Sequence, residues 1–115
     1  MEINETQRPW GSFRQFTLNE ISTVKILFVK AEQEDSLQLH AEREEFWRIL
    51  SGEPTIIIGE KEISAKPGDE FMVPRQTKHR IRAHDTDAQV LEISLGTFDE
   101  QDEVRLEDDY GRATS

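Results

Sequence analysis

Short apolar runs that alternate with polar residues set the strongest limit on how this chain can fold. Successive side chains of a β-strand point to opposite faces, so an apolar residue at every second position fits a half-buried strand. The runs are rich in β-branched or aromatic residues and end near Gly, Pro, Asp or Ser; they cover residues 23–29, 55–58, 61–65 and 88–95. We therefore predict an all-β chain of at least seven strands, folded as a sandwich or a closed barrel.

Turn signals between these runs predict how the strands connect. Ser51–Pro54 and Gly59–Glu60 separate runs that are close enough to form hairpins. The acidic segment 98–103 is predicted to be a loop, and residues 1–6 and 113–115 are predicted to be loose ends. Since the 115 residues contain no internal repeat or low-complexity linker, we predict a single domain over 1–115, ordered from about 8 to 112.

Composition excludes several classes of function. The chain has no cysteine, so disulfides, thiolate metal ligands and cysteine nucleophiles are excluded. Its net charge of −10 argues against nucleic acid or an anionic membrane as a partner, because both bind mainly through Lys and Arg. The first residues have neither a basic nor an apolar stretch, and no apolar run is long enough to span a membrane. These features predict a cytoplasmic protein.

Four potential metal ligands have a spacing that strands can bring together. Gln38 and His40 are two residues apart and share one face of a strand, while Glu45 and His79 come from elsewhere in the fold. We expect neighbouring antiparallel strands to aim all four side chains at one point. Nitrogen and oxygen donors of this kind fit one divalent transition metal, which could be Zn, Mn, Co, Fe or Ni.

The order of these ligands resembles the cupin motif pattern, with Gln in place of the usual first His. The matching positions are Gln38, His40, Glu45, Gly52, Gly68, Pro74 and His79. This resemblance implies a cupin fold, the double-stranded β-helix or jelly-roll barrel.

Further motifs narrow the resemblance to the type II phosphomannose isomerase domain. They are Arg8–Gly11, Ser36–His40, Thr77–Arg80 and Val104–Arg112, so the similarity covers about residues 8 to 112. It implies a metal-dependent isomerase that interconverts mannose 6-phosphate and fructose 6-phosphate. In larger family members a nucleotidyltransferase domain precedes this one. No Gly-rich nucleotide loop occurs here, so we expect a stand-alone isomerase domain without guanylyltransferase activity.

The phosphate of such a substrate requires a cationic anchor. Arg112 and Lys78 are candidates for catalysis and substrate binding, and Arg8 is a further candidate for substrate binding. An arginine binds phosphate through its planar fork, but Arg8 and Arg112 could instead form surface ion pairs with a nearby Asp or Glu. Lys78 could instead point away from the metal, as strand alternation from His79 predicts. Both interpretations stay open for all three residues.

The chain also departs from the family pattern, which carries additional histidines after the Gln-x-His motif. Here Ala41, Glu42 and Phe46 stand in their place, so the general base is not identified. One alternative is therefore a noncatalytic metal-containing cupin that binds sugars or sugar phosphates as a sensor or partner module. Another is a different metal-dependent cupin enzyme, such as an oxygenase.

Strand alternation predicts which side chains face the barrel interior. If Glu45 points inward, Trp47 and Ile49 point inward as well, whereas Phe46 and Leu50 face outward and are exposed. An exposed apolar pair of this kind predicts a homodimer formed by sheet packing. Three further expectations concern single residues: Trp10 is a core aromatic, His84 is a surface turn residue, and Ile81 faces inward with His79.

Overall fold

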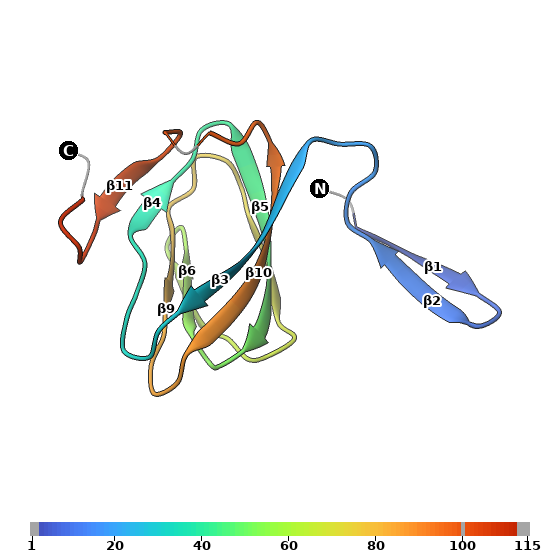
Figure 1. Cartoon of the computed structure of the whole chain (residues 1–115), viewed down its shortest axis with the longest axis horizontal. Helices are drawn as coiled ribbons and strands as arrows, with labels where there is room; N and C mark the ends of the chain where they lie inside the picture. The colour runs from blue at the N-terminus through green and yellow to red at the C-terminus, as the bar shows by residue number, and fades with distance from the viewer. Residues whose placement is uncertain (1–2, 100, 113–115) are drawn as a thin grey trace.

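Two antiparallel sheets form the body of the protein (Figure 1). The computed structural model describes residues 3–99 and 101–112, and those residues form strands and no helix. The first sheet has the order β3-β10-β5-β8: β3 (Ser22–Val29), β10 (Ala88–Gly96), β5 (Arg43–Ser51) and β8 (Glu70–Val73). The second has the order β11-β4-β9-β6-β7: β11 (Val104–Glu107), β4 (Leu37–Leu39), β9 (His79–Arg82), β6 (Thr55–Ile58) and β7 (Lys61–Ser64). The predicted all-β class is confirmed.

A hairpin at the N-terminus stands apart from this body. Among the described residues, strands β1 (Asn4–Arg8) and β2 (Gly11–Gln15) pair only with each other, and Figure 1 shows them projecting away from the two sheets. Residues 4–6, which we expected to be part of a loose end, thus form the first half of β1. The other predicted loose ends, residues 1–2 and 113–115, lie outside the described residues.

The core lies between the inner faces of the two sheets, as alternation predicts. Trp47 and Ile49 of β5 and Ile81 of β9 are fully buried and belong to one hydrophobic cluster. The remaining buried members come from four other segments: Ile56, Ala65, Val73 and Val90. Because this cluster is apolar and continuous, it can hold the barrel together without help from a metal ion.

The outer face of the first sheet differs from the prediction at one position. Phe46 does point outward, but only 2% of its surface is exposed. The segment after β2 crosses this face and places the ring of Phe16 at 5.1 Å from that of Phe46. Leu50 is exposed as predicted. The expectation that Trp10 is a core residue is also wrong, since its position at the hairpin tip leaves 74% of it exposed.

One of the two predicted hairpins is present. Gly59–Glu60 joins β6 to β7, which pair along their whole length. Ser51–Pro54 instead carries the chain from one sheet to the other, since β5 pairs with β8 and β10 and not with β6. Gly52 is needed at this crossing, because its φ is +81° and an added Cβ would lie 2.4 Å from the carbonyl oxygen of Asp87.

Candidate metal centre

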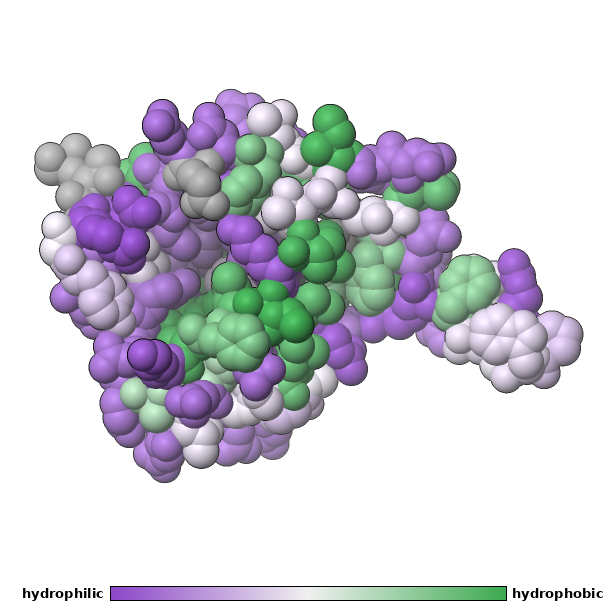
Figure 2. Space-filling view, viewed as in Figure 1, coloured by the Kyte–Doolittle hydropathy of each residue, from purple (hydrophilic) through white to green (hydrophobic). Residues whose placement is uncertain are grey.

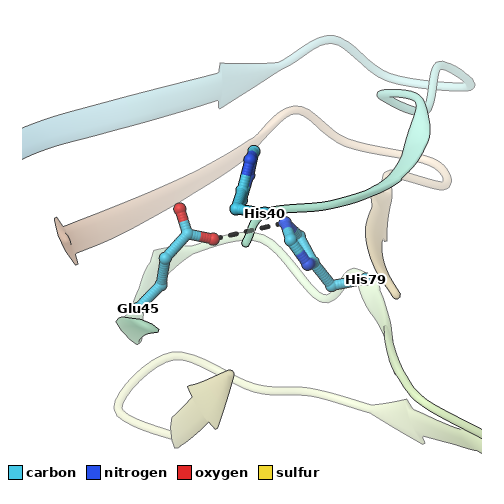
Figure 3. Close-up of side chains that lie close together, drawn as sticks. All are labelled: His40, Glu45 and His79. Carbon is cyan, nitrogen blue, oxygen red and sulfur yellow. Dashed lines mark ion pairs between the residues drawn. The ribbon is translucent and has the colours of Figure 1, made fainter. Parts of the chain in front are cut away.

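Three of the four predicted ligands converge inside the barrel. His40 follows β4, Glu45 lies in β5 and His79 begins β9, and one donor atom from each lies within 4.8 Å of the others. Figure 3 shows the three side chains pointing toward one another. All three are buried. The group therefore joins the two facing sheets, whereas we had expected it to lie on neighbouring strands of one sheet.

Backbone carbonyls orient both imidazole rings. The Nδ1 atom of His40 lies 2.7 Å from the carbonyl oxygen of Asp102, and that of His79 lies 2.9 Å from the carbonyl oxygen of Thr77. Since a carbonyl oxygen only accepts, each Nδ1 carries the proton and each Nε2 presents a lone pair. Burial lowers the pKa of both histidines, that of His79 to about 4, so both rings are neutral at pH 7. Neutral, oriented imidazoles are the form that binds metals.

Two facing acceptor atoms in this group lack a hydrogen-bond partner. Nε2 of His79 and Oε1 of Glu45 lie 3.3 Å apart, the contact drawn as a dashed line in Figure 3, and both are buried without a hydrogen bond. Because His79 is neutral, this contact lacks the charge of an ion pair. A buried polar atom without a partner costs about 1–3 kcal/mol. A divalent cation between the two atoms would satisfy both, so the donor set fits such an ion.

A second buried carboxyl accompanies Glu45. Glu92 of β10 points into the barrel beside it, and Ser94 donates a hydrogen bond of 2.9 Å to Glu92. Burial, and then the neighbouring Glu92, raise the pKa of Glu45 to about 9, so the two carboxyls share a proton at pH 7. A metal cation competes with that proton for Glu45. The sequence analysis missed Glu92; only its position between apolar residues in the run 88–95 hints at an inward carboxyl.

Arg43 was also missed by the sequence analysis, although it is buried beside the centre. Its guanidinium donates to Nε2 of His40 over 3.2 Å and to the carbonyl oxygen of Asp99 over 3.2 Å. It also lies against the ring of Phe98, at 4.3 Å from the ring centre. Arg43 thus donates a hydrogen bond to the Nε2 lone pair of His40 in this structure, and a bond from His40 to a metal would replace that hydrogen bond.

Strand register places Gln38 and Arg105 next to the centre. Gln38 pairs directly with His79 across β4 and β9, and Arg105 of β11 pairs directly with Gln38, so the three side chains share one face. The amide oxygen of Gln38 accepts a hydrogen bond of 2.9 Å from Ser36. Arg105 pairs with Glu103, and its Nε is buried without a hydrogen bond. Ligation by Gln38 stays a prediction.

The predicted phosphate anchors lie outside this group of ligands. Lys78 pairs with Glu60 at 2.9 Å, and Arg8 lies over the ring of Phe13 on the projecting hairpin. Arg112 is held by both carboxylate oxygens of Asp108, at 3.0 Å each. Arg112 also lines an open pocket of about 540 Å³, which contains Phe28 of β3, Asp35 and Tyr110.

Titration of Glu45 should weaken the metal-free protein at alkaline pH. Its pKa is about 9 in the folded state and 4.5 ordinarily, so the unfolded chain releases the proton first. The stability from the protonated carboxyl is complete below pH 4.5 and is lost as the pH rises to 9. The lowered pKa of His79 has the opposite effect on stability, but only below pH 6.5. Thermal unfolding of chelator-treated protein should therefore show stability falling from about pH 7 to 9, by on the order of 1 kcal/mol per pH unit at most.

The Glu45→Gln variant is the control for this measurement, because it keeps the shape of the side chain and removes its titration. Its stability should be nearly constant over the same pH range. A wild-type profile that is flat from about pH 7 to 9 would contradict the assignment of the raised pKa to Glu45.

Comparison with known proteins agrees with this geometry. Residues 2–108 match the family model described as "Mannose-6-phosphate isomerase C-terminal". The chain belongs to this family. It is 31% identical over 107 residues to the xanthan biosynthesis protein XanB of Xanthomonas campestris, and the match covers 91% of this chain and 23% of that protein. It is 30% identical over 110 residues to the alginate biosynthesis protein AlgA of Pseudomonas aeruginosa, covering 94% of this chain and 23% of that protein. The chain thus spans about a quarter of these relatives.

Solved structures support the cupin fold. A cupin protein from Bacteroides fragilis superposes with a TM-score of 0.62 at 27% identity, over 70% of this chain and 69% of that one. The capsular polysaccharide assembling protein CapF of Staphylococcus aureus superposes with a TM-score of 0.69 at 19% identity, over 92% of this chain and 34% of that one. The predicted cupin barrel and the predicted family are both confirmed. Within the described residues, no helix has the length and hydropathy that crossing a membrane requires.

Proposed function

We propose that this domain is a metal-dependent sugar-phosphate isomerase that interconverts mannose 6-phosphate and fructose 6-phosphate. The observation that carries the proposal is the buried group of His40, Glu45 and His79, with two facing acceptor atoms that lack partners. A divalent cation held there would stabilise the negative charge that develops on the sugar oxygens during aldose–ketose isomerisation. Membership of the mannose-6-phosphate isomerase C-terminal family supports this choice of reaction.

The positions of the replaced histidines are compatible with catalysis. Ala41 and Glu42 lie in an exposed turn, where both carboxylate oxygens of Asp102 accept hydrogen bonds from their backbone N–H groups. Phe46 faces the outside of the first sheet and packs against Phe16. Side chains at these three positions point away from the buried group, so their replacement removes no group from the barrel interior.

Asp35 is our candidate for the proton carrier between C1 and C2 of the sugar. It lines the open pocket together with Tyr110 and Arg112. One of its oxygens accepts a hydrogen bond of 2.8 Å from the backbone N–H of Ile81, which fixes the carboxyl beside β9. Burial raises the pKa of Asp35 to about 7, and the charge of Glu92 adds to this effect. A carboxyl that titrates near pH 7 can both take and return a proton.

Arg112 is the candidate phosphate anchor because it lies on the wall of the same pocket as Asp35. In Arg112→Lys the charge stays, but the planar fork that can bind two phosphate oxygens at once is lost. We expect KM for the sugar phosphate to rise about tenfold or more, with unchanged thermal stability. Arg48→Lys is the matched control, because Arg48 forms its ion pair with Glu70 of β8, and neither residue lines this pocket. If Arg112→Lys leaves KM unchanged, Arg105 becomes the preferred anchor.

A coupled isomerase assay on metal-loaded protein tests the proposal directly. Sustained conversion of mannose 6-phosphate that requires the added metal would support it. Metal and sugar-phosphate binding without turnover would instead support the noncatalytic binding module. Oxygen consumption would reveal the alternative metal-dependent oxygenase.

A further inference from the structure

The N-terminal hairpin carries apolar side chains that the described part of its own chain leaves exposed. We call residues Asn4–Gln15 the arm. At its tip Trp10 is 74% exposed, and an added Cβ at Gly11 would meet no atom within 4 Å. The radius of gyration is 14.9 Å, compared with about 13 Å for a compact domain of this length. The arm thus extends into solvent, where an exposed tryptophan contributes nothing to the stability of a lone chain.

The base of the arm is nevertheless fixed to the body. Both terminal nitrogens of Arg14 donate to the carboxylate of Glu70 in β8, at 2.6 and 2.8 Å. This forked ion pair holds the direction of the hairpin while its tip stays free. An arm with a fixed direction and a free apolar tip can bind a separate surface at a smaller cost in chain entropy than a disordered tail.

A second uncovered apolar surface lies along β3. Val24, Ile26 and Phe28 alternate on the outer side of this strand and are 59%, 47% and 71% exposed. Figure 2 shows hydrophobic side chains gathered in the middle of the face where Figure 1 places β3, well away from the tip of the arm. We call these three side chains the β3 face.

β3 is also an edge strand, since its sheet has the order β3-β10-β5-β8. Within residues 3–99 and 101–112, its eight residues pair on one side only, with β10. An edge strand of this length with exposed apolar side chains is a site where another chain pairs or packs.

We propose that the arm of one copy packs on the β3 face of a second copy, and that the second arm packs on the first copy in return. Each chain has an uncovered apolar projection and an uncovered apolar face, and the arm points away from its own β3 face (Figure 1). A two-fold arrangement of two copies covers both arms and both β3 faces through two identical contacts. It replaces the predicted pairing through Phe46, which Phe16 already covers.

Charge favours this arrangement over random association of an acidic protein. Of the three charged residues of the arm, Arg14 pairs with Glu70 of its own chain, whereas Arg8 lies near the tip and Glu5 lies further from it; the whole chain carries a charge of −10. In the described part of the chain, Arg8 contacts the carbonyl oxygen of Gln7 and the ring of Phe13, and no carboxylate. A basic arm tip therefore meets an acidic body when two copies exchange arms.

The molar mass of the full chain in solution tests the proposal. Light scattering after size exclusion should give twice the 13.4 kDa of one chain. The double variants Trp10→Ser/Phe13→Ser on the arm and Ile26→Ser/Phe28→Ser on the face should each weaken dimerisation about 100-fold or more. Leu106→Ser is the matched control, because it removes a similarly exposed apolar side chain from β11 and should remain dimeric.

Three results would overturn the proposal. The first is a monomeric wild type at about 100 μM, well above the Kd of a stable dimer; another protein or domain would then cover the face. The second is a dimer that survives the arm substitutions. The third applies if a double variant unfolds, and it uses two separate proteins, Ser12→Cys and Val24→Cys, made in a chain that otherwise has no cysteine. The two proteins are mixed and oxidised. Failure to form a disulfide between the arm of one copy and the β3 face of the other rejects the exchange.

Discussion

His79→Ala and Glu45→Ala are each expected to lose the bound metal and to remain folded. Each substitution removes one of three converging donors, and the remaining two hold a divalent ion weakly. The fold persists because the apolar cluster around Trp47 and Ile81 does not include the donors. Elemental analysis should give about one equivalent of metal in the wild type and less than about a tenth in either variant.

His84→Ala is the control for this experiment. His84 is exposed and its ring contacts the Thr55 hydroxyl, so the variant should keep its metal. Unchanged metal content in both ligand variants would show that the ligands are assigned wrongly. Unfolding of both would show that the ion is structural. A wild type that stays below about a tenth of an equivalent after incubation with Zn, Mn, Co and Ni would remove the site altogether.

Asp35→Asn is expected to lower kcat of the metal-loaded protein by about 100-fold or more, the usual contribution of a positioned general base. The amide oxygen of Asn can still accept the hydrogen bond from Ile81, so the backbone at β9 should be undisturbed. The amide cannot take up a proton, however. Metal content and KM should stay near their wild-type values, and steady-state kinetics with elemental analysis measure all three quantities.

Asp87→Asn controls for the loss of a carboxylate that caps a backbone group. Asp87 accepts a hydrogen bond of 2.8 Å from the N–H of Ala31, which resembles the contact between Asp35 and Ile81. Its replacement should leave kcat unchanged. If Asp35→Asn also keeps full kcat, Asp35 only supports β9, and Glu92 becomes the next residue to test as the base.

Local patterns in the sequence were sufficient for the all-β fold class and for three of the four side chains that we predicted to lie together. Period-two alternation identified Trp47, Ile49 and Ile81 as inward-facing, because neighbouring side chains of a strand must point to opposite faces. The spacing of His40, Glu45 and His79 identified a group that the structure brings together. Both inferences depend on geometry within a few residues or on a motif, so they need no knowledge of how distant segments meet.

Contacts between distant segments were decided only by the tertiary structure. Phe46 follows the outward pattern of β5, yet a segment about thirty residues earlier covers it; Trp10 has the composition of a core residue, yet the hairpin holds it in solvent. Glu92 meets Glu45, and Asp35 meets β9, through pairings that no local period encodes. Alternation specifies the face on which a side chain lies, but what covers that face depends on sheet order and chain crossings, and these are set by packing of the whole chain.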